Sequence, residues 1–213
     1  MSERREERLT RAADIEPASM RVVDELLPDG GWSAEERAIV KRLVHASGDP
    51  SLASVVAFAP GAVAAGVAAL RAGGDVLSDV QMVAVGVDQR RLDALGGTLR
   101  CAIGDAEVAR QAAESGRTRA ATAMRSLAEL LPGSIVAIGN APTALREIIA
   151  LAEAGVRPAL VVGVPVGFID AAESKAALEA TDLPYVTIRG TRGGSPLAAA
   201  AVNALLRLAE ADG

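Results

Sequence analysis

The chain has few of the residues that build disulfides, metal centres and aromatic cores. Its 213 residues include one cysteine, Cys101, one histidine, His45, and only one Trp, one Tyr and two Phe. An internal disulfide needs two cysteines and a Cys/His metal site needs several soft ligands, so both are excluded. A magnesium site made of carboxylates stays open, but it has no motif here. Abundant Ala, Val and Leu favour helices packed on parallel strands over an aromatic-cored β-sandwich.

Positive charge and long apolar runs are also scarce. The net charge is −5 and no basic stripe offsets it, which argues against a nucleic-acid partner. The apolar segment 53–70 is broken by Pro60, Gly61 and Gly66, so no membrane span is expected. Residues 1–14 alternate Arg and Glu and lack the apolar stretch of a secretion signal. We therefore expect a cytoplasmic protein, with residues 1–14 as a charged arm and residues 15–213 as a single α/β domain.

A short apolar run, a glycine loop and a helix recur three times in the second half of the chain. The runs cover residues 135–138, 159–162 and 185–188. This order predicts a three-layer, doubly wound and mainly parallel sheet with helices on both faces. All three loops would then emerge at the carboxyl ends of strands, where such sheets hold their ligands. Because no P-loop and no Gly-x-Gly-x-x-Gly motif is present, the loops are expected to bind an anion rather than a nucleotide.

Several polar residues stand where helices are expected to begin. Asn140 precedes Pro142 and is expected to cap one helix, and Asp170 with Glu173 forms a capping-box-like pair at another. Asp79 is expected to cap a helix that runs through Val85. Each of these side chains is thereby given a local structural role.

The single histidine lies at the end of an early helix. Ser33 and Glu36 form a capping box at its start, and His45 falls in its last turn, before Gly48. His45 either caps the final carbonyl groups or acts as an acid/base group, since imidazole is the side chain that ordinarily titrates near neutral pH. Ser19, at the expected entrance of the preceding helix, is either its N-cap or a contact to a ligand.

Two cations occur where an anion site is plausible. Lys175 is one of only two lysines and follows a glycine-proline loop, so it either reaches over that loop or is a solvated surface residue. Arg119 stands at a helix start, where the helix dipole favours acids instead. A guanidinium there can clamp a carboxylate, although surface arginines are common. Arg117 and Arg192 are further candidates by position alone.

Six segments together resemble the precorrin-8X methylmutase family of cobalamin biosynthesis, also called cobalt-precorrin-8 methylmutase. They are residues 44–49 (Val-His-Ala-Ser-Gly-Asp), 79–83 (Asp-Val-Gln-Met-Val), 118–119 (Thr-Arg), 138–145, 163–175 and 193–195 (Gly-Gly-Ser). The likeness runs from about Ser19 to Leu205 and lies in the order and spacing of all six. Two positions depart from the usual pattern: Ala120 follows Thr118-Arg119 in place of Ser, and Ser78 precedes Asp79 where Cys is common.

The resemblance implies an isomerase that needs no cofactor. The family moves a methyl group from C11 to C12 of a tetrapyrrole by a [1,5]-sigmatropic shift, which gives hydrogenobyrinic acid or its cobalt counterpart. By this likeness, His45 would donate and accept the proton, and Ser19, Arg119 and Lys175 would bind the substrate. The enzyme would be a homodimer with its sites near the subunit interface.

A second interpretation needs no catalysis. The chain would then be a binding protein for a corrinoid or another anionic small molecule, with His45 merely capping its helix. The sequence does not distinguish a metal-free substrate from a cobalt-containing one, because the macrocycle itself would hold the metal.

Overall fold

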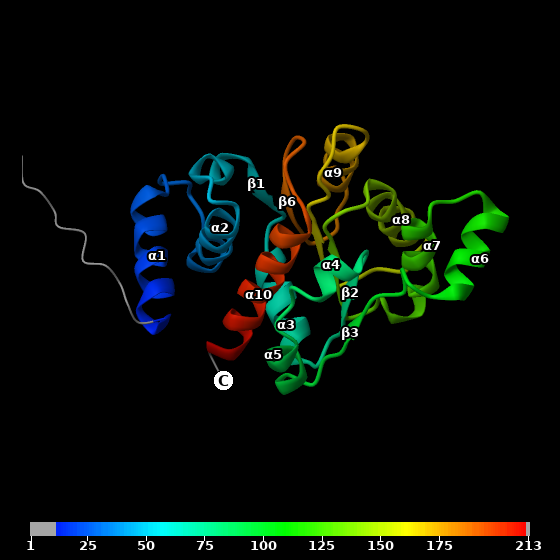
Figure 1. The fold of residues 1–213 in the computed structure, drawn as a ribbon, viewed down its shortest axis with the longest axis horizontal. Helices are drawn as coiled ribbons and strands as arrows, with labels where there is room; N and C mark the ends of the chain where they lie inside the picture. Colours follow the sequence, from blue (N-terminus) through cyan, green and yellow to red (C-terminus); the bar gives the residue numbers. More distant parts are fainter. Residues whose placement is uncertain (1–11, 212–213) are drawn as a thin grey trace, which may run out of the picture.

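The computed structural model describes residues 12–211 and is built on one six-stranded sheet (Figure 1). The strand order is β1-β6-β5-β4-β2-β3, and every neighbouring pair is parallel except β1, which runs antiparallel to β6. The strands are β1 (Val56–Phe58), β2 (Val76–Ser78), β3 (Leu99–Arg100), β4 (Ile135–Ile138), β5 (Leu160–Gly163) and β6 (Tyr185–Ile188). The expected doubly wound, mainly parallel sheet is confirmed.

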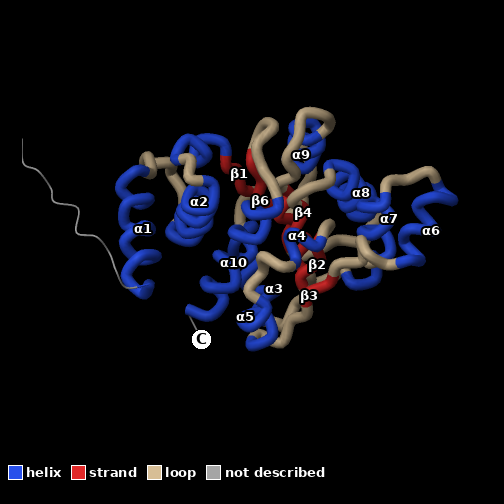
Figure 2. Tube along the Cα trace, viewed as in Figure 1, coloured by secondary structure: helices blue, strands red, loops and turns tan. Residues whose placement is uncertain are grey.

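Helices cover both faces of this sheet (Figure 2). The α-helices are α1 (Ala12–Leu26), α2 (Ala34–Ser47), α3 (Ala62–Arg71), α4 (Gln81–Ala84), α5 (Gln89–Ala94), α6 (Ala106–Ser115), α7 (Arg119–Ser126), α8 (Pro142–Glu153), α9 (Ala171–Glu179) and α10 (Ser195–Ala211). Two 3₁₀ segments are η1 (Pro50–Val55) and η2 (Ala128–Leu130). No helix among residues 12–211 is long and apolar enough to cross a membrane.

The helices form successive layers along the long axis of the molecule. On one face α3 and α10 contact the strands, α2 packs on α10, and α1 packs on α2. On the other face α8 and α9 contact the strands, α7 packs on α8, and α6 packs on α7. Figure 1 accordingly places α1 at one end of the molecule and α6 at the other.

The central strands explain why the sheet forms. All residues of β4, β5 and β6 are buried, which is expected for parallel strands covered on both faces. Each Val, Ile or Leu buried in this way stabilises the fold by roughly 1.5–3 kcal/mol relative to an exposed side chain. The edge strand β3 is only two residues long, because the chain leaves this edge of the sheet after Arg100.

The capping box that begins α2 is confirmed. The Ser33 hydroxyl accepts a hydrogen bond from the Glu36 amide, and the Glu36 carboxylate accepts one from the Ser33 amide. Gly48 ends the helix in the left-handed conformation, at φ 66°, as a C-terminal glycine commonly does. Ser33 and Gly48 thus fix the two ends of α2, and these ends place His45 in its last turn.

Two other capping predictions are wrong, and a third is correct in position only. Ala141, not Asn140, is the residue before α8, and Val80, not Asp79, precedes α4. Asp170 does precede α9, but it has a left-handed backbone at φ 60° and makes no capping hydrogen bond. Its carboxylate instead accepts from Nε of Arg146 at 2.9 Å, and this guanidinium lowers the pKa of Asp170. Asp79 likewise accepts its side-chain hydrogen bonds from a distant segment, residues 139–141.

The boundary between the expected arm and the domain falls within α1. Residues 1–11 lie outside the described part of the chain, and residues 12–14 belong to the first turn of α1. Ser19 therefore lies inside α1 and is not its N-cap, so that structural interpretation of Ser19 is wrong.

Candidate functional site

His45 and Ser19 meet on the outer side of α2. The Ser19 hydroxyl oxygen lies 3.1 Å from Nδ1 of His45, and His45 is exposed in the last turn of its helix. Nε2 of the ring has no hydrogen-bond partner among residues 12–211. A hydrogen bond at one ring nitrogen fixes the orientation of the imidazole and leaves the other free to exchange a proton. Capping of the α2 carbonyl groups by His45 is not observed.

Ion pairs hold α1 in the position that brings Ser19 to His45. Glu16 of α1 pairs with Arg42 of α2 and, at 3.3 Å, with Arg207 of α10. The hydrogen bond and charge of Arg42 are the main reasons that the pKa of Glu16 is lowered. Asp24 near the other end of α1 pairs with Arg37 at 2.9 Å and with Lys41 at 3.2 Å. α1 is therefore tied to α2 above and below Ser19.

The turn after His45 is tied to the glycine loop that follows β6. Nη1 of Arg192 donates to Asp49 Oδ2 at 2.8 Å and to the Ser51 hydroxyl at 3.0 Å. Hydrogen bonds from Ser51 and then the pairing with Arg192 lower the pKa of Asp49. Arg192, a candidate for substrate contact by position, is thus occupied in holding two segments together.

Lys175 lies beneath the same loop. Its side chain is buried, with 0% of its surface exposed, and Nζ donates to the carbonyl oxygen of Arg192 at 2.6 Å. It is therefore not a solvated surface lysine. Burial lowers the pKa of Lys175 to about 8, and no carboxylate among residues 12–211 pairs with it. An ammonium has three N–H donors, and the described residues use only one of those of Lys175. A buried ammonium with unused donors therefore lies beneath the loop after β6.

Of the two arginines near the start of α7, only one has a partner. Arg117 pairs with Glu147 of α8 at 3.2 Å, and Arg125 reaches the same carboxylate at 2.5 Å. Arg119 is exposed and makes no hydrogen bond or ion pair with any residue between 12 and 211. The Thr118 and Thr143 hydroxyl groups lie 2.7 Å apart, which places the start of α7 beside the start of α8.

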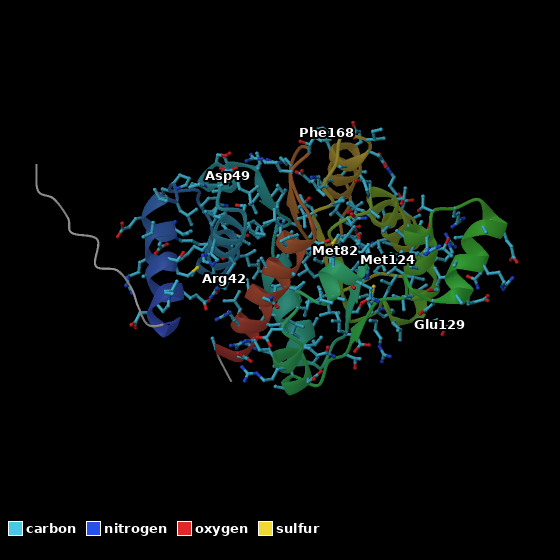
Figure 3. All side chains as sticks on the ribbon, viewed as in Figure 1. Arg42, Asp49, Met82, Met124, Glu129 and Phe168 are labelled. Carbon is cyan, nitrogen blue, oxygen red and sulfur yellow. The ribbon has the colours of Figure 1, made fainter. Side chains whose placement is uncertain are left out.

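The predicted site residues do not all meet within one chain. Ser19 and His45 lie on α1 and α2, beyond α10 on one face of the sheet, whereas Arg119 begins α7, beyond α8 on the other face. Figure 3 shows Asp49, four residues after His45, well apart from Met124 of α7. Among the predicted site residues, only Lys175 lies on a helix, α9, that contacts the sheet directly. One chain alone therefore does not bring the histidine to the free arginine.

A cavity of about 610 Å³ opens at the carboxyl ends of the parallel strands. It is lined by Met82, Val85, Gly86, Asn140, Val166, Gly193, Gly194, Ser195, Pro196 and Ala199. A larger cavity of about 790 Å³, between the start of α2, α3 and the end of α10, includes none of the predicted site residues. Because open parallel sheets bind ligands beyond their carboxyl ends, the 610 Å³ cavity is the candidate ligand site.

Two buried polar groups lie at this carboxyl edge of the sheet, and one of them, Ser195, lines the cavity. Asp79 accepts hydrogen bonds from the amides of Gly139, Asn140 and Ala141, at 3.1, 2.9 and 2.8 Å. Burial raises the pKa of Asp79, and the three amide bonds oppose that rise. The Ser195 hydroxyl is buried without a hydrogen-bond partner among residues 12–211. The available sequence signal was that Asp79 directly follows a buried strand, at the edge where the other loops emerge.

No group of three or more His, Cys, Asp or Glu side chains within the described range could hold a metal ion. The candidate groups that the chain offers are one imidazole and two cations without a carboxylate partner in that range, which suit proton transfer and binding of carboxylates.

Comparisons with known proteins agree on one family. The sequence profile described as precorrin-8X methylmutase matches residues 14–208. The cobalt-precorrin-8 methylmutase of Priestia megaterium is 42% identical over 197 residues, covering 92% of this chain and 88% of the relative. The precorrin-8X methylmutase of Pseudomonas aeruginosa is 48% identical over 178 residues, covering 82% and 85%. The crystal structure of precorrin-8X methylmutase from Thermus thermophilus superposes with a TM-score of 0.87 at 39% identity, covering 92% of this chain and 96% of that one.

Proposed function

The chain belongs to the precorrin-8X methylmutase family and is an isomerase of that kind, and we propose that it shifts the substrate methyl group with His45 as its acid/base residue. The shift breaks the bond from the methyl carbon to C11 of the macrocycle and forms a bond from that carbon to C12. The product is hydrogenobyrinic acid, or its cobalt counterpart. The observation that carries this role is the pair formed by Ser19 and Nδ1 of His45, which leaves Nε2 available.

Proton transfer is the step that an enzyme can assist in such a rearrangement. A sigmatropic shift develops little charge, so an oxyanion hole has little to stabilise. Nε2 of His45 would protonate the macrocycle, select the tautomer in which migration is favourable, and take the proton back afterwards. General acid/base assistance of this kind accelerates a reaction by about 10²- to 10⁴-fold. Ser19, which the family resemblance assigns to substrate binding, also holds the ring at Nδ1.

The substrate carries acetate and propionate arms, and the chain offers two uncommitted cations for them. Arg119 is exposed without a partner in the described range, and Lys175 is buried with one neutral partner. A planar guanidinium can hold a carboxylate through two hydrogen bonds, while an ammonium acts as a compact charge. We assign Arg119 to direct contact with an arm and Lys175 to charge and support beneath the loop after β6.

A homodimer would complete this site. His45 and Arg119 lie on opposite faces of the sheet in one chain, so a single substrate is reached by both only if they come from different subunits. We propose that His45 and Ser19 of one subunit face Arg119 of its partner, in two equivalent sites related by a two-fold axis.

Two exposed apolar surfaces support this arrangement. One is a stripe along the outer face of α1, formed by Ile15, Val22 and Leu26. The other surrounds the carboxyl edge of the sheet and consists of Met82, Val85, Val166, Phe168 and Ile169. Phe168 is 94% exposed at the outer rim (Figure 3). Exposed apolar patches commonly mark interfaces. If the α1 stripe of each subunit packs on the edge patch of the other, Ser19 and His45 approach the partner's cavity.

The deciding experiment uses the purified full chain and an excess of precorrin-8X, followed by absorption. An isomerase converts many equivalents, whereas a corrinoid-binding protein, the alternative function, changes the spectrum of one equivalent only. A stoichiometric change that stops at one equivalent would reject the proposal. Repeating the assay with cobalt-precorrin-8 identifies the preferred substrate.

Cytoplasmic location and the lack of a nucleic-acid partner stay predictions from the sequence. The second rests on the net charge of −5 and the absence of a basic stripe.

A further inference from the structure

Asp79 is a buried carboxylate that neither the proton transfer nor the cation assignment uses. It lies at the carboxyl end of β2 with 0% of its surface exposed, and its oxygens accept from three successive amides, those of residues 139–141. A charged acceptor strengthens each of these hydrogen bonds, and the loss of a buried charged partner is costly. Asp79 therefore fixes the backbone of the loop that connects β4 to α8.

Close packing leaves this loop no freedom on its other side. A Cβ on Gly139 would lie 2.7 Å from Cα of Ser195 and 2.7 Å from Cγ2 of Val83, so only glycine fits. Pro142, directly after this loop, begins α8. The path of residues 139–141 is thus set by Asp79 below, by Ser195 beside it and by the helix that follows.

The one side chain that this fixed loop presents to the cavity is that of Asn140. Asn140 is exposed, lines the 610 Å³ cavity, and its carboxamide makes no hydrogen bond with any residue from 12 to 211. Met82 and Val166 line the same cavity, and the buried Ser195 hydroxyl, also without a partner in that range, belongs to its wall. Apolar walls with a few unsatisfied polar groups suit a flat apolar ligand that carries polar arms.

The guanidinium without a partner in the described range is that of Arg119, which begins the neighbouring helix α7. Thr118 of the turn before α7 and Thr143 of the first turn of α8 are hydrogen-bonded, so Arg119 and Asn140 flank the same pair of helix starts. Asp79 itself is fully buried, and its carboxylate already accepts hydrogen bonds from three amides, so it is not available to a ligand.

We infer that Asn140 binds a carboxylate arm of the substrate through its amide group, next to Arg119, and that Asp79 is the positioning residue that holds Asn140 in place. This inference rests on the proposed function. It adds two residues to the site, of which Asn140 touches the substrate and Asp79 acts only through the loop.

The test measures binding of hydrogenobyrinic acid by absorption titration, together with kcat and KM for precorrin-8X. Asn140→Ala should weaken product binding about tenfold, as expected for one hydrogen bond to a charged group, and should raise KM more than it lowers kcat. Asn140→Asp should weaken binding further, because it repels a carboxylate. Binding as tight as in the wild type for Asn140→Ala, or tighter binding for Asn140→Asp, would overturn the inference.

Asp79 is tested by Asp79→Asn alone and combined with Asn140→Ala. We expect Asp79→Asn to weaken product binding about as much as Asn140→Ala, and the double variant to lose no more than either single one. The matched control is Asp75→Asn at the opposite end of β2, where Asp75 accepts from the Thr98 amide at 2.8 Å. This control should leave product binding unchanged.

Additive losses in the double variant would show that Asp79 does not act through Asn140 and would overturn its positioning role. If Asp79→Asn does not fold, Asn140→Ala and Asn140→Asp still decide the inference. Failure of the wild-type chain to convert precorrin-8X rejects the proposed function and this inference together. Normal conversion with unaffected Asn140 variants rejects the inference alone.

Discussion

The Ser19 hydroxyl oxygen lies 3.1 Å from Nδ1 of His45, across the contact between α1 and α2. This contact is formed by residues 26 positions apart in the sequence. It gives the imidazole a fixed orientation without using the nitrogen that faces away from Ser19.

Replacement of His45 by alanine should remove most of the turnover without unfolding the protein. The side chain is exposed and carries no part of the core, so thermal unfolding should stay close to that of the wild type. Turnover of precorrin-8X should fall about 10²- to 10⁴-fold, while product binding is retained. Retention of a near wild-type rate would remove His45 from the mechanism.

Replacement of Ser19 by alanine separates its two candidate roles. If Ser19 mainly orients His45, kcat should fall about tenfold, as expected for one lost hydrogen bond, while KM stays near its wild-type value. If Ser19 mainly contacts the substrate, KM should rise with little change in kcat. We expect the first result. Ser47→Ala is a suitable control, because Ser47 caps the same helix end through Val44 and does not touch His45.

Lys175→Met should change the pH dependence of stability. Burial lowers the pKa of Lys175 from 10.5 to about 8 in the folded chain. Between these values the unfolded chain binds more protons, so the free energy of unfolding of the wild type should rise as the pH rises from about 8 to 10.5. At about 1.36 kcal/mol per pKa unit this gain is at most about 3 kcal/mol.

The measurement is urea unfolding of both proteins at several pH values. Lys175→Met should lack the rise above pH 8, and at pH 7 it should be no less stable than the wild type, because a methionine avoids burial of a charge. Product binding should nevertheless weaken. Lys41→Met, which removes the other lysine from its surface pair with Asp24, should keep the wild-type pH dependence. Parallel curves for the wild type and Lys175→Met would contradict the prediction.

Mixed dimers test whether the site is shared between subunits. His45→Ala and Arg119→Ala chains with different tags are co-expressed, and the heterodimer is purified through both tags. A site built from two subunits leaves one of the two sites intact, so the heterodimer should have about half of the wild-type activity. Each homodimer should be nearly inactive. A heterodimer as inactive as both homodimers would place His45 and Arg119 in the same subunit's site.

The sequence was sufficient for the sheet because buried parallel strands appear as short apolar runs. β4, β5 and β6 are such runs, each followed by a glycine loop and a helix, and their positions match the prediction. The capping box of Ser33 and Glu36 was equally readable, since both partners lie within four residues. Local patterns therefore located the helix on which His45 lies and the strands that the three loops follow.

The same local patterns failed where the partner is distant in the chain. Asp79 and Asp170 look like helix caps, but amides 60 or more residues away and the guanidinium of Arg146 are their actual partners. Ser19 looks like a cap because Pro17 precedes it, whereas α1 continues through both positions. The burial of Lys175 depends on the packing of α9 under the loop after β6, which no pattern near Lys175 reveals.

The antiparallel edge strand explains how an early residue can take part in a site at the far edge of the sheet. Val56, the first residue of β1, lies opposite Ile188, the last residue of β6. The chain therefore enters β1 from the edge at which the parallel strands end, and it delivers the end of α2 there. If β1 ran parallel to β6, the segment before it would arrive at the opposite edge, and the histidine would be a full strand length from the glycine loops. The reversal of one three-residue strand thus decides on which side of the protein His45 lies.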